Sequence, residues 1–183
     1  MDYEKKDRYT LAILVYNRPS VLMRVVALFS RRGYNIDSLS VGETENPAIS
    51  RITIVVTGDR LIVEQIIRQV EKLVDVIKVY EMTRGGSLQR ELVLVKIHAE
   101  AASRGEIVEI GEIFKAKIID VTPSTVTFQL TGSLEKLESF MELTRPYGIV
   151  ELVRTGITAL ERGARPISET TFGDEGEDKE GAE

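Results

Sequence analysis

The chain has 183 residues, 43% of them hydrophobic and 29% charged, which is typical of a globular protein with one ordinary domain or two small ones. It has no cysteine and one histidine, which excludes disulfides, thiolate metal sites, a cysteine nucleophile and multi-histidine metal sites. It has no run of 18 apolar residues and no apolar leader, which favours a cytoplasmic protein.

The net charge of −5 is concentrated near one end of the sequence. Residues 169–183 contain seven acidic residues and one lysine, a net charge of −6, which leaves about +1 for the remainder. A nearly neutral folded part argues against a protein that binds duplex nucleic acid through a strongly basic face. We expect 166–183 to be an acidic, disordered tail, and we favour a solubilising role over a specific interaction arm.

Between residues 9 and 83 the hydrophobic pattern predicts one domain with elements in the order β-α-β-β-α-β. Strands are predicted over 9–16, 34–41, 49–58 and 76–82, and helices over 21–32 and from Asp59, as the cap, to Val74. Gly33 follows the first helix, where a left-handed C-terminal cap is expected. This order is that of the ferredoxin-like fold, a four-stranded antiparallel sheet with both helices on one face.

The same order of elements repeats after the adjacent glycines Gly85 and Gly86. Strands are predicted over 90–99, 117–123, 124–132 and 148–156, and helices around 107–114 and 134–141. The expected fold class is therefore α+β, with two ferredoxin-like βαββαβ units in tandem. The expected organisation is an N-terminal extension over 1–8, a first domain over 9–83, a linker over 84–88 and a second domain over 89–165.

The sequence contains no recognisable catalytic constellation. His98 ends an apolar run, where a structural or surface role is favoured over catalysis. Glu106, Glu109 and Glu112 are spaced by three, which favours a solvated helix face. Neither a glycine-rich phosphate loop nor a nucleophile-elbow motif is present. The residues therefore favour a regulatory or binding module over an enzyme.

Polar residues stand at both ends of the first predicted helix. The start of a helix leaves backbone N–H groups unpaired, and together with the helix dipole these favour an anion such as a carboxylate. Asn17 precedes that start, and its amide offers a donor and an acceptor for the charged ends of an amino acid. Asn17 or Ser20 acting simply as a helix cap is the alternative that the residues alone favour. Arg31 and Arg32 at the other end are better explained by the helix dipole than by phosphate binding.

A family resemblance adds to this interpretation. The segment "NRPSVLMRVVALFSRRGYNIDSLSVGETENPAISRITIVVTGD" resembles the N-terminal ACT domain of the small, regulatory subunit of acetolactate synthase. The similarity extends through "KLVDVIKV", "RELVLVKI", "FKAKIIDVTPSTVTFQLTG" and "GIVELVRTGITALERG". It covers about residues 9–163, nearly the whole expected folded part, and it makes the domain over 9–83 an ACT domain.

The resemblance implies a non-catalytic subunit that binds and activates a thiamine-diphosphate-dependent catalytic subunit and makes it sensitive to branched-chain amino acids, chiefly valine. It implies a homodimer through ACT domains with effector sites between them. The implied effector-binding residues are Asn17, Ser20, Val21, Leu22, Asn35 and Ile36. The resemblance implies no cofactor in this chain, because thiamine diphosphate, magnesium and FAD belong to the catalytic partner. Candidate partner surfaces are the helix faces and the loop over 42–48, including Asn46 and Pro47.

One position departs from the family pattern. The family has glycine where this chain has Ser20, and glycine there lets the effector approach the backbone closely. A serine side chain would either crowd the ligand or donate a hydrogen bond to it. The alternative function is a stand-alone amino-acid-sensing regulator that acts on a different partner. A metal-responsive regulator is disfavoured by the single histidine and the lack of cysteine.

Overall fold

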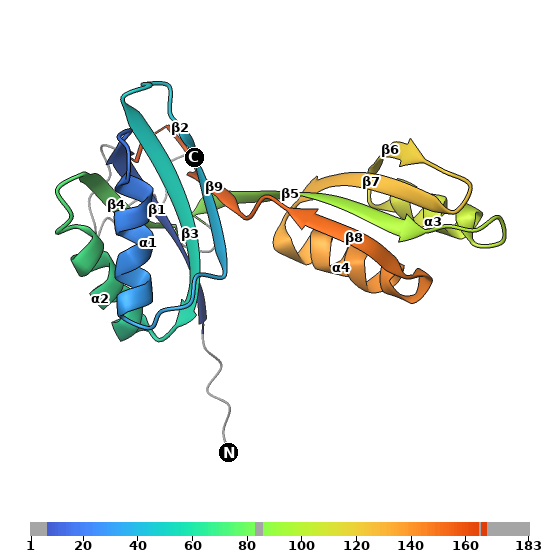
Figure 1. Ribbon diagram of the computed structural model, residues 1–183, viewed down its shortest axis with the longest axis horizontal. Coiled ribbons are helices and arrows are strands. Elements are labelled where there is room, and N and C mark those ends of the chain that lie inside the picture. The colour runs from blue at the N-terminus through green and yellow to red at the C-terminus, as the bar shows by residue number, and fades with distance from the viewer. Residues whose placement is uncertain (1–6, 83–85, 165, 168–183) are drawn as a thin grey trace, which may run out of the picture. The chain divides into compact units, whose positions relative to one another are not determined.

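The computed structural model describes residues 7–82, 86–164 and 166–167. The chain forms two compact units (Figure 1). Among the described residues, those up to Leu88 together with those from Ala159 onward form the first unit, and Gln89–Thr158 form the second. The sequence placed the end of the second domain at 165, whereas the described residues from Ala159 onward group with the first unit.

The first unit has the predicted order of elements. They are β1 (Asp7–Tyr16), α1 (Val21–Arg31), β2 (Ser38–Glu43), β3 (Ile49–Gly58), α2 (Arg60–Val70) and β4 (Val76–Met82). The strands form an antiparallel sheet in the order β2-β3-β1-β4. The helices α1 and α2 cover one face of this sheet (Figure 1), so the ferredoxin-like prediction is confirmed for this unit.

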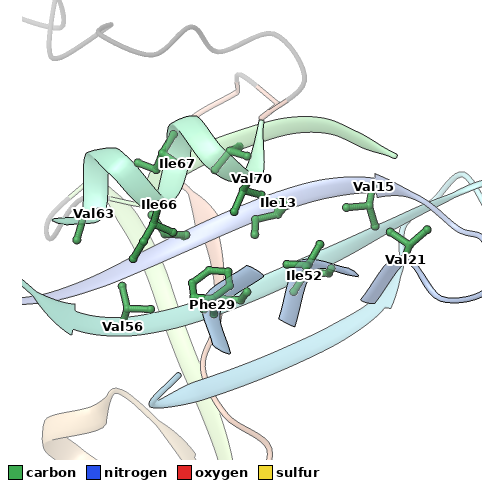
Figure 2. Packing of buried hydrophobic residues seen from close by; sticks show 14 residues of the cluster. Ile13, Val15, Val21, Phe29, Ile52, Val56, Val63, Ile66, Ile67 and Val70 are labelled. Carbon is green, nitrogen blue, oxygen red and sulfur yellow. The ribbon is translucent and has the colours of Figure 1, made fainter. Parts of the chain in front are cut away.

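The core of the first unit lies between the two helices and the sheet. Successive strand residues point to opposite faces, so alternate residues of β1 and β3 meet the helices. Figure 2 shows Ile13, Val15, Ile52 and Val56 of the strands among side chains of α1 and α2. On α1, Val21, Val25 and Phe29 are buried at helical spacing. The predicted amphipathic pattern is therefore what fixes each helix on the sheet.

The second unit repeats this architecture. Its elements are β5 (Ser87–His98), α3 (Arg104–Ile113), β6 (Lys117–Val121), β7 (Thr125–Gly132), α4 (Leu134–Thr144), the short 3-10 helix η1 (Arg145–Tyr147) and β8 (Ile149–Arg154). The strand order is β6-β7-β5-β8, and its core contains Phe128 and Phe140 in edge-to-face contact with ring centroids 5.7 Å apart. The tandem ferredoxin-like prediction is thus confirmed for both units.

A buried carboxylate ties together three elements of the second unit. Glu91 on β5 is 5% exposed and accepts two hydrogen bonds from the Arg154 guanidinium, at 2.6 and 2.9 Å. Arg154 also donates to Glu138 of α4 at 2.7 Å. The hydrogen bond to Glu91, and then that to Glu138, raise the pKa of Arg154 above its ordinary value despite partial burial. This charge network joins β5, β8 and α4 by bidentate geometry.

Two element boundaries in the first unit differ by four residues from the sequence prediction. β2 begins at Ser38 and not at 34, because Asn35 donates a hydrogen bond to Asp37 in the connection after α1. α2 ends at Val70, and Val74, which the helical pattern included, lies outside the helix and is 91% exposed. Asp59 stands at the N-cap of α2 as predicted, although its side chain makes no capping bond.

A further strand was not predicted. β9 (Thr158–Glu161) pairs with β5, and Ala159 and Ile167 are buried against Ala12, Leu14 and Met82. These three strand residues alternate with the core residues of β1 and β4, so they point away from the helices. The chain that returns from the second unit therefore covers part of the helix-free face of the first sheet.

The outer segments of the expected organisation are only partly described. Of the predicted extension over 1–8, Asp7 and Arg8 belong to β1, and the rest lies outside the described residues. Residues 84 and 85 of the linker also lie outside, and of the predicted tail only Pro166 and Ile167 are described. Among the described residues, no helix is long and apolar enough to cross a membrane.

The packing of α3 against β7 depends on Gly111. A Cβ placed on Gly111 would lie 2.4 Å from Cε1 of Phe128, which is fully buried. We expect Gly111→Ala to lower the free energy of unfolding of the second unit by about 2–3 kcal/mol, because the ring has no room to move away. Urea unfolding followed by circular dichroism measures this change.

The matched control is Gly105→Ala in the same helix. A Cβ on Gly105 would meet nothing within 4 Å, so alanine there should leave stability unchanged or raise it by up to about 1 kcal/mol. Equal effects of the two substitutions would contradict the packing argument.

Candidate effector site

The turn between β1 and α1 brings the first candidate residue against the β2–β3 loop. Asn17 Nδ2 donates to Glu43 Oε1 at 3.0 Å and to the Pro47 carbonyl at 2.9 Å. The Asn17 backbone N–H donates to the Ala48 carbonyl at 2.8 Å. Both amide protons are thus used within the chain, whereas Oδ1 accepts no hydrogen bond from the described residues. Asn17 is therefore free to accept one from a ligand.

Neither Asn17 nor Ser20 caps α1 through its side chain. Ser20 is the N-cap residue, its φ of 67° is left-handed, and it makes no side-chain capping bond. The first turn of α1 contains no acidic residue. The backbone N–H groups of Leu22 and Met23 have no acceptor among the described residues. Ser20 therefore stands at the predicted N-cap position, but capping by the side chain of Asn17 or Ser20 is wrong, and the start of α1 keeps donors for an anion.

The helices of the second unit begin differently. At α4, the Ser133 hydroxyl accepts from the Lys136 N–H, and Glu135 lies in the first turn. At α3, Glu106 lies in the first turn and accepts a hydrogen bond from the Tyr147 hydroxyl at 3.0 Å. At each of these two helix starts, a carboxylate of the chain provides the negative charge that the helix dipole favours. The second unit therefore does not duplicate the site at α1.

Two arginines lie beside the start of α1 and share one carboxylate. Arg24 Nη2 lies 2.5 Å from Asp75 Oδ2, and Arg18 Nη1 lies 3.9 Å from the other oxygen of the same carboxylate. The Arg18 guanidinium also lies over the Tyr16 ring, 4.9 Å from its centroid. Asp75 is largely buried and is shared by both arginines. One carboxylate for two arginines leaves positive charge beside the unpaired helix donors.

The structure separates the candidate residues into two groups. Asn17, Ser20, Val21 and Leu22 lie at the start of α1, whereas Asn35 and Ile36 follow its C-terminus. A helix of 11 residues is about 16 Å long, so the two groups of one chain do not share one small-molecule site. A site built from both groups requires a second chain.

Not every candidate can offer its side chain to a ligand. The side chain of Val21 is 3% exposed and belongs to the core, so only its backbone is available. Leu22 and Ile36 pack partly against the same core. Asn35 donates from Nδ2 to Asp37 at 2.8 Å, and Thr57 donates to the second oxygen of Asp37 at 2.6 Å. Asn35 is thus held in place by a local network.

Sequence reasoning missed Glu43 and Asp75. Each lies far from the β1–α1 turn in the sequence, and only strand pairing or the α2–β4 connection brings it there. The register of β2 with β3 places Glu43 opposite Ser50, at the end of the hairpin that Asn17 contacts. Asp75 comes close because its carbonyl accepts from the Tyr16 N–H at 2.9 Å. No local sequence signal indicated either contact.

The site offers recognition of a small zwitterion. Helix N–H groups and arginines suit a carboxylate, while Asn17 Oδ1 and the Glu43 carboxylate suit an ammonium group. Within the part of the chain that the structure describes, no group of three or more His, Asp or Glu side chains could hold a metal ion. His98, at the end of β5, is exposed and packs beside Gly148, in agreement with a surface role.

Two protein-family models match this chain. Residues 11–78 match the small-subunit-like ACT domain of acetohydroxyacid synthase, and residues 90–163 match the small subunit of acetolactate synthase. Together they cover most of both structural units, including β9, and leave out residues 79–89 and the chain ends.

Curated proteins and a crystal structure are similar over most of the length. A probable acetolactate synthase small subunit of Archaeoglobus fulgidus is 51% identical, covering 85% of this chain and 98% of its own. One from Methanothermobacter thermautotrophicus is 47% identical, covering 88% and 96%. The isozyme 3 small subunit of Escherichia coli is 46% identical, covering 85% and 96%. The Thermotoga maritima small-subunit structure matches with a TM-score of 0.80 and 38% identity, covering 87% and 99%.

The left-handed backbone at Ser20 predicts a stability change. Ser20→Gly should raise the free energy of unfolding of the first unit by about 0.5–1 kcal/mol, because glycine adopts φ 67° without the steric cost that serine meets. Ser30→Gly, at an exposed position of α1 with helical backbone, should lower it by about 0.5 kcal/mol. Thermal unfolding of both variants checks the pair, and the same sign for both would contradict the prediction.

Proposed function

This chain belongs to the acetolactate synthase small-subunit family, and we propose that it is the non-catalytic, regulatory subunit of that enzyme. In this proposal it binds the catalytic large subunit, raises its activity and makes it sensitive to feedback by valine. Thiamine diphosphate, magnesium and FAD are assigned to the catalytic partner. The names of the relatives, which are small subunits of acetolactate synthase, support this assignment.

The observation that carries the effector proposal is the start of α1. Leu22 and Met23 present backbone N–H groups without acceptors, and Arg18 and Arg24 add positive charge. A valine carboxylate would bind there, as anions bind at helix starts. Asn17 Oδ1 and Glu43 would hold the ammonium group, and the partly buried Leu22 would offer an apolar contact for the branched side chain.

We propose that a second copy of the chain completes the site. Asn35 and Ile36 lie at the opposite end of α1, so they reach the same ligand only from another protomer. A two-fold arrangement with α1 helices antiparallel would bring the end of one helix to the start of the other. Valine would then bind between ACT domains and contact both chains.

Regulation follows if valine binds one packing of the two domains better than another. Differential affinity would shift the population between these packings and so change the contact with the catalytic subunit. The β2–β3 loop is suited to transmit the change, because Asn17 at the site holds that loop through the Pro47 carbonyl. This loop also contains Asn46, which hydrogen-bonds to Thr44 and Ala48 and keeps the loop ordered.

Reconstitution tests the proposed function directly. The chain is mixed with an acetolactate synthase catalytic subunit, and acetolactate formation is measured with and without valine. We expect activation by the chain and inhibition by valine that depends on it. No activation, together with unchanged valine sensitivity, would instead support a stand-alone amino-acid sensor that acts on a different partner.

Valine binding to the isolated chain is a separate prediction. We expect binding heat at millimolar valine in calorimetric titration, and tighter binding by Ser20→Gly if the serine side chain crowds the ligand. A folded dimer that gives no heat would remove the effector proposal.

Glu43 provides a test of how the ammonium group is recognised. Glu43→Gln should weaken valine binding about 5- to 10-fold, because a charge-assisted contact becomes a neutral one. Isovalerate, which has the carboxylate and branched chain but no ammonium group, should bind both forms equally. Glu45→Gln is the matched control, because Glu45 lies exposed in the same loop and its substitution removes the same charge. An equal loss in both variants would indicate a general charge effect.

A further inference from the structure

The helix-free face of the first unit contains cations as well as apolar residues. By alternation along the strands this face includes Arg8, Thr10, Ala12 and Leu14 of β1, Arg51, Thr53, Val55 and Thr57 of β3, and Lys78, Tyr80 and Met82 of β4. Among these, Thr10, Thr53 and Val55 are each at most 5% exposed. The face is therefore a place where a charge is only partly hydrated.

Arg51 is a partly buried cation that pairs with no carboxylate of the described residues. Its Nη2 donates to the Ala159 carbonyl at 2.6 Å, while its Nε is shut off from solvent and has no acceptor. Burial lowers the pKa of Arg51, and no acidic side chain of the described residues offsets that effect. Arg8, on the same face, likewise has a buried Nε without an acceptor. Buried guanidinium groups are normally paired.

The last described residue before the acidic segment packs next to the strand residue that pairs with Arg51. Ile167 is 7% exposed and packs in one cluster with Leu14, which lies directly opposite Arg51 in the β1–β3 register. The sequence then continues for 16 residues that contain seven carboxylates, the first at Glu169. Two residues of extended chain span about 7 Å, a length that would allow a carboxylate two residues after Ile167 to reach Arg51. The negative charge of the segment and its continuity with Ile167 both point to residues 168–183 as the ligand of Arg51 on this face.

We propose that the acidic segment 168–183 docks on the helix-free face of the first unit and supplies a carboxylate to Arg51. The segment is then an intramolecular ligand of the ACT sheet and not only a solubilising tail. It acts on the face opposite the helices, so this interaction is separate from the effector site. It adds to the contact that β9 and Ile167 make with the same face.

A double-mutant cycle between Arg51→Gln and truncation after Ile167 tests the proposal. The cycle compares thermal unfolding of the full chain, each single variant and the double variant. We expect a coupling of about fivefold in the folding equilibrium constant, because truncation should cost less once Arg51 is neutral. The cycle cancels the separate loss of the Arg51 bond to the Ala159 carbonyl.

The control cycle uses Arg68→Gln in place of Arg51→Gln. Arg68 lies on α2 of the same unit, its side chain is 74% exposed, and it pairs only weakly with Glu64 at 3.7 Å. A coupling as large for Arg68 as for Arg51 would mean that the coupling reflects only the overall charge of the unit, and this would overturn the proposal. A coupling below about 1.5-fold for Arg51 would also overturn it. Coupling that grows with protein concentration would place the segment on a second copy instead.

An NMR measurement keeps the proposal testable if Arg51→Gln does not fold. The Nε–Hε signal of Arg51 should shift on truncation after Ile167, and its exchange with water should become at least severalfold faster. The corresponding signal of Arg68 should not change. An Arg51 signal that is the same in both chains would show that no carboxylate of the segment reaches it.

Discussion

Strand β1 is buried on both faces, and most of the first unit follows from that constraint. Leu11, Ala12, Ile13, Leu14 and Val15 are consecutive and each is at most 7% exposed. A strand paired on both edges satisfies its own backbone, but its two rows of side chains each need a cover. Helices α1 and α2 cover one face of the strand. The chain that returns after the second unit covers part of the other, which is why the two units are not simply consecutive in sequence.

The same strand determines where the site lies. β1 ends at Tyr16, whose N–H bonds to the Asp75 carbonyl, and the chain must turn within four residues to begin α1 at Val21. Ser20 completes that turn only in the left-handed region, a conformation that glycine adopts at lower cost. A serine with φ 67° does not cap the helix here.

Features that depend on nearby residues could be predicted from the sequence, whereas those that depend on distant pairing could not. The stripe of Val21, Val25 and Phe29 and the left-handed Gly33, with φ 70°, follow from local periodicity and glycine chemistry. Strand β9 has only four residues, and its small Ala159 gives no recognisable alternation. Glu43 meets Asn17 across 26 residues, through a register that no single segment encodes.

Helix periodicity also fails where a helix stops. Val74 continues the apolar spacing of α2, yet the chain leaves the helix after Val70 through the tight turn that bonds Leu73 to Val70. The apolar spacing of the sequence does not indicate the backbone hydrogen bonds with which a helix ends. The side chain of Val74 is consequently exposed beside Asp75, at the connection that holds the start of α1.

Two units with one topology differ at the corresponding turn, and the difference has a physical cause. In the second unit the Arg104 guanidinium occupies the turn after β5, where it donates to the carbonyls of Ala99, Thr122 and Pro123. Those bonds tie the β6–β7 turn to the start of α3, and Glu106 supplies the negative charge that the helix dipole favours. In the first unit the arginines instead flank the turn, and the first turn of α1 contains no acidic residue. The shared fold alone therefore does not set the charge at the start of the first helix of a unit; arginines flank that start in the first unit, whereas Glu106 places a carboxylate there in the second.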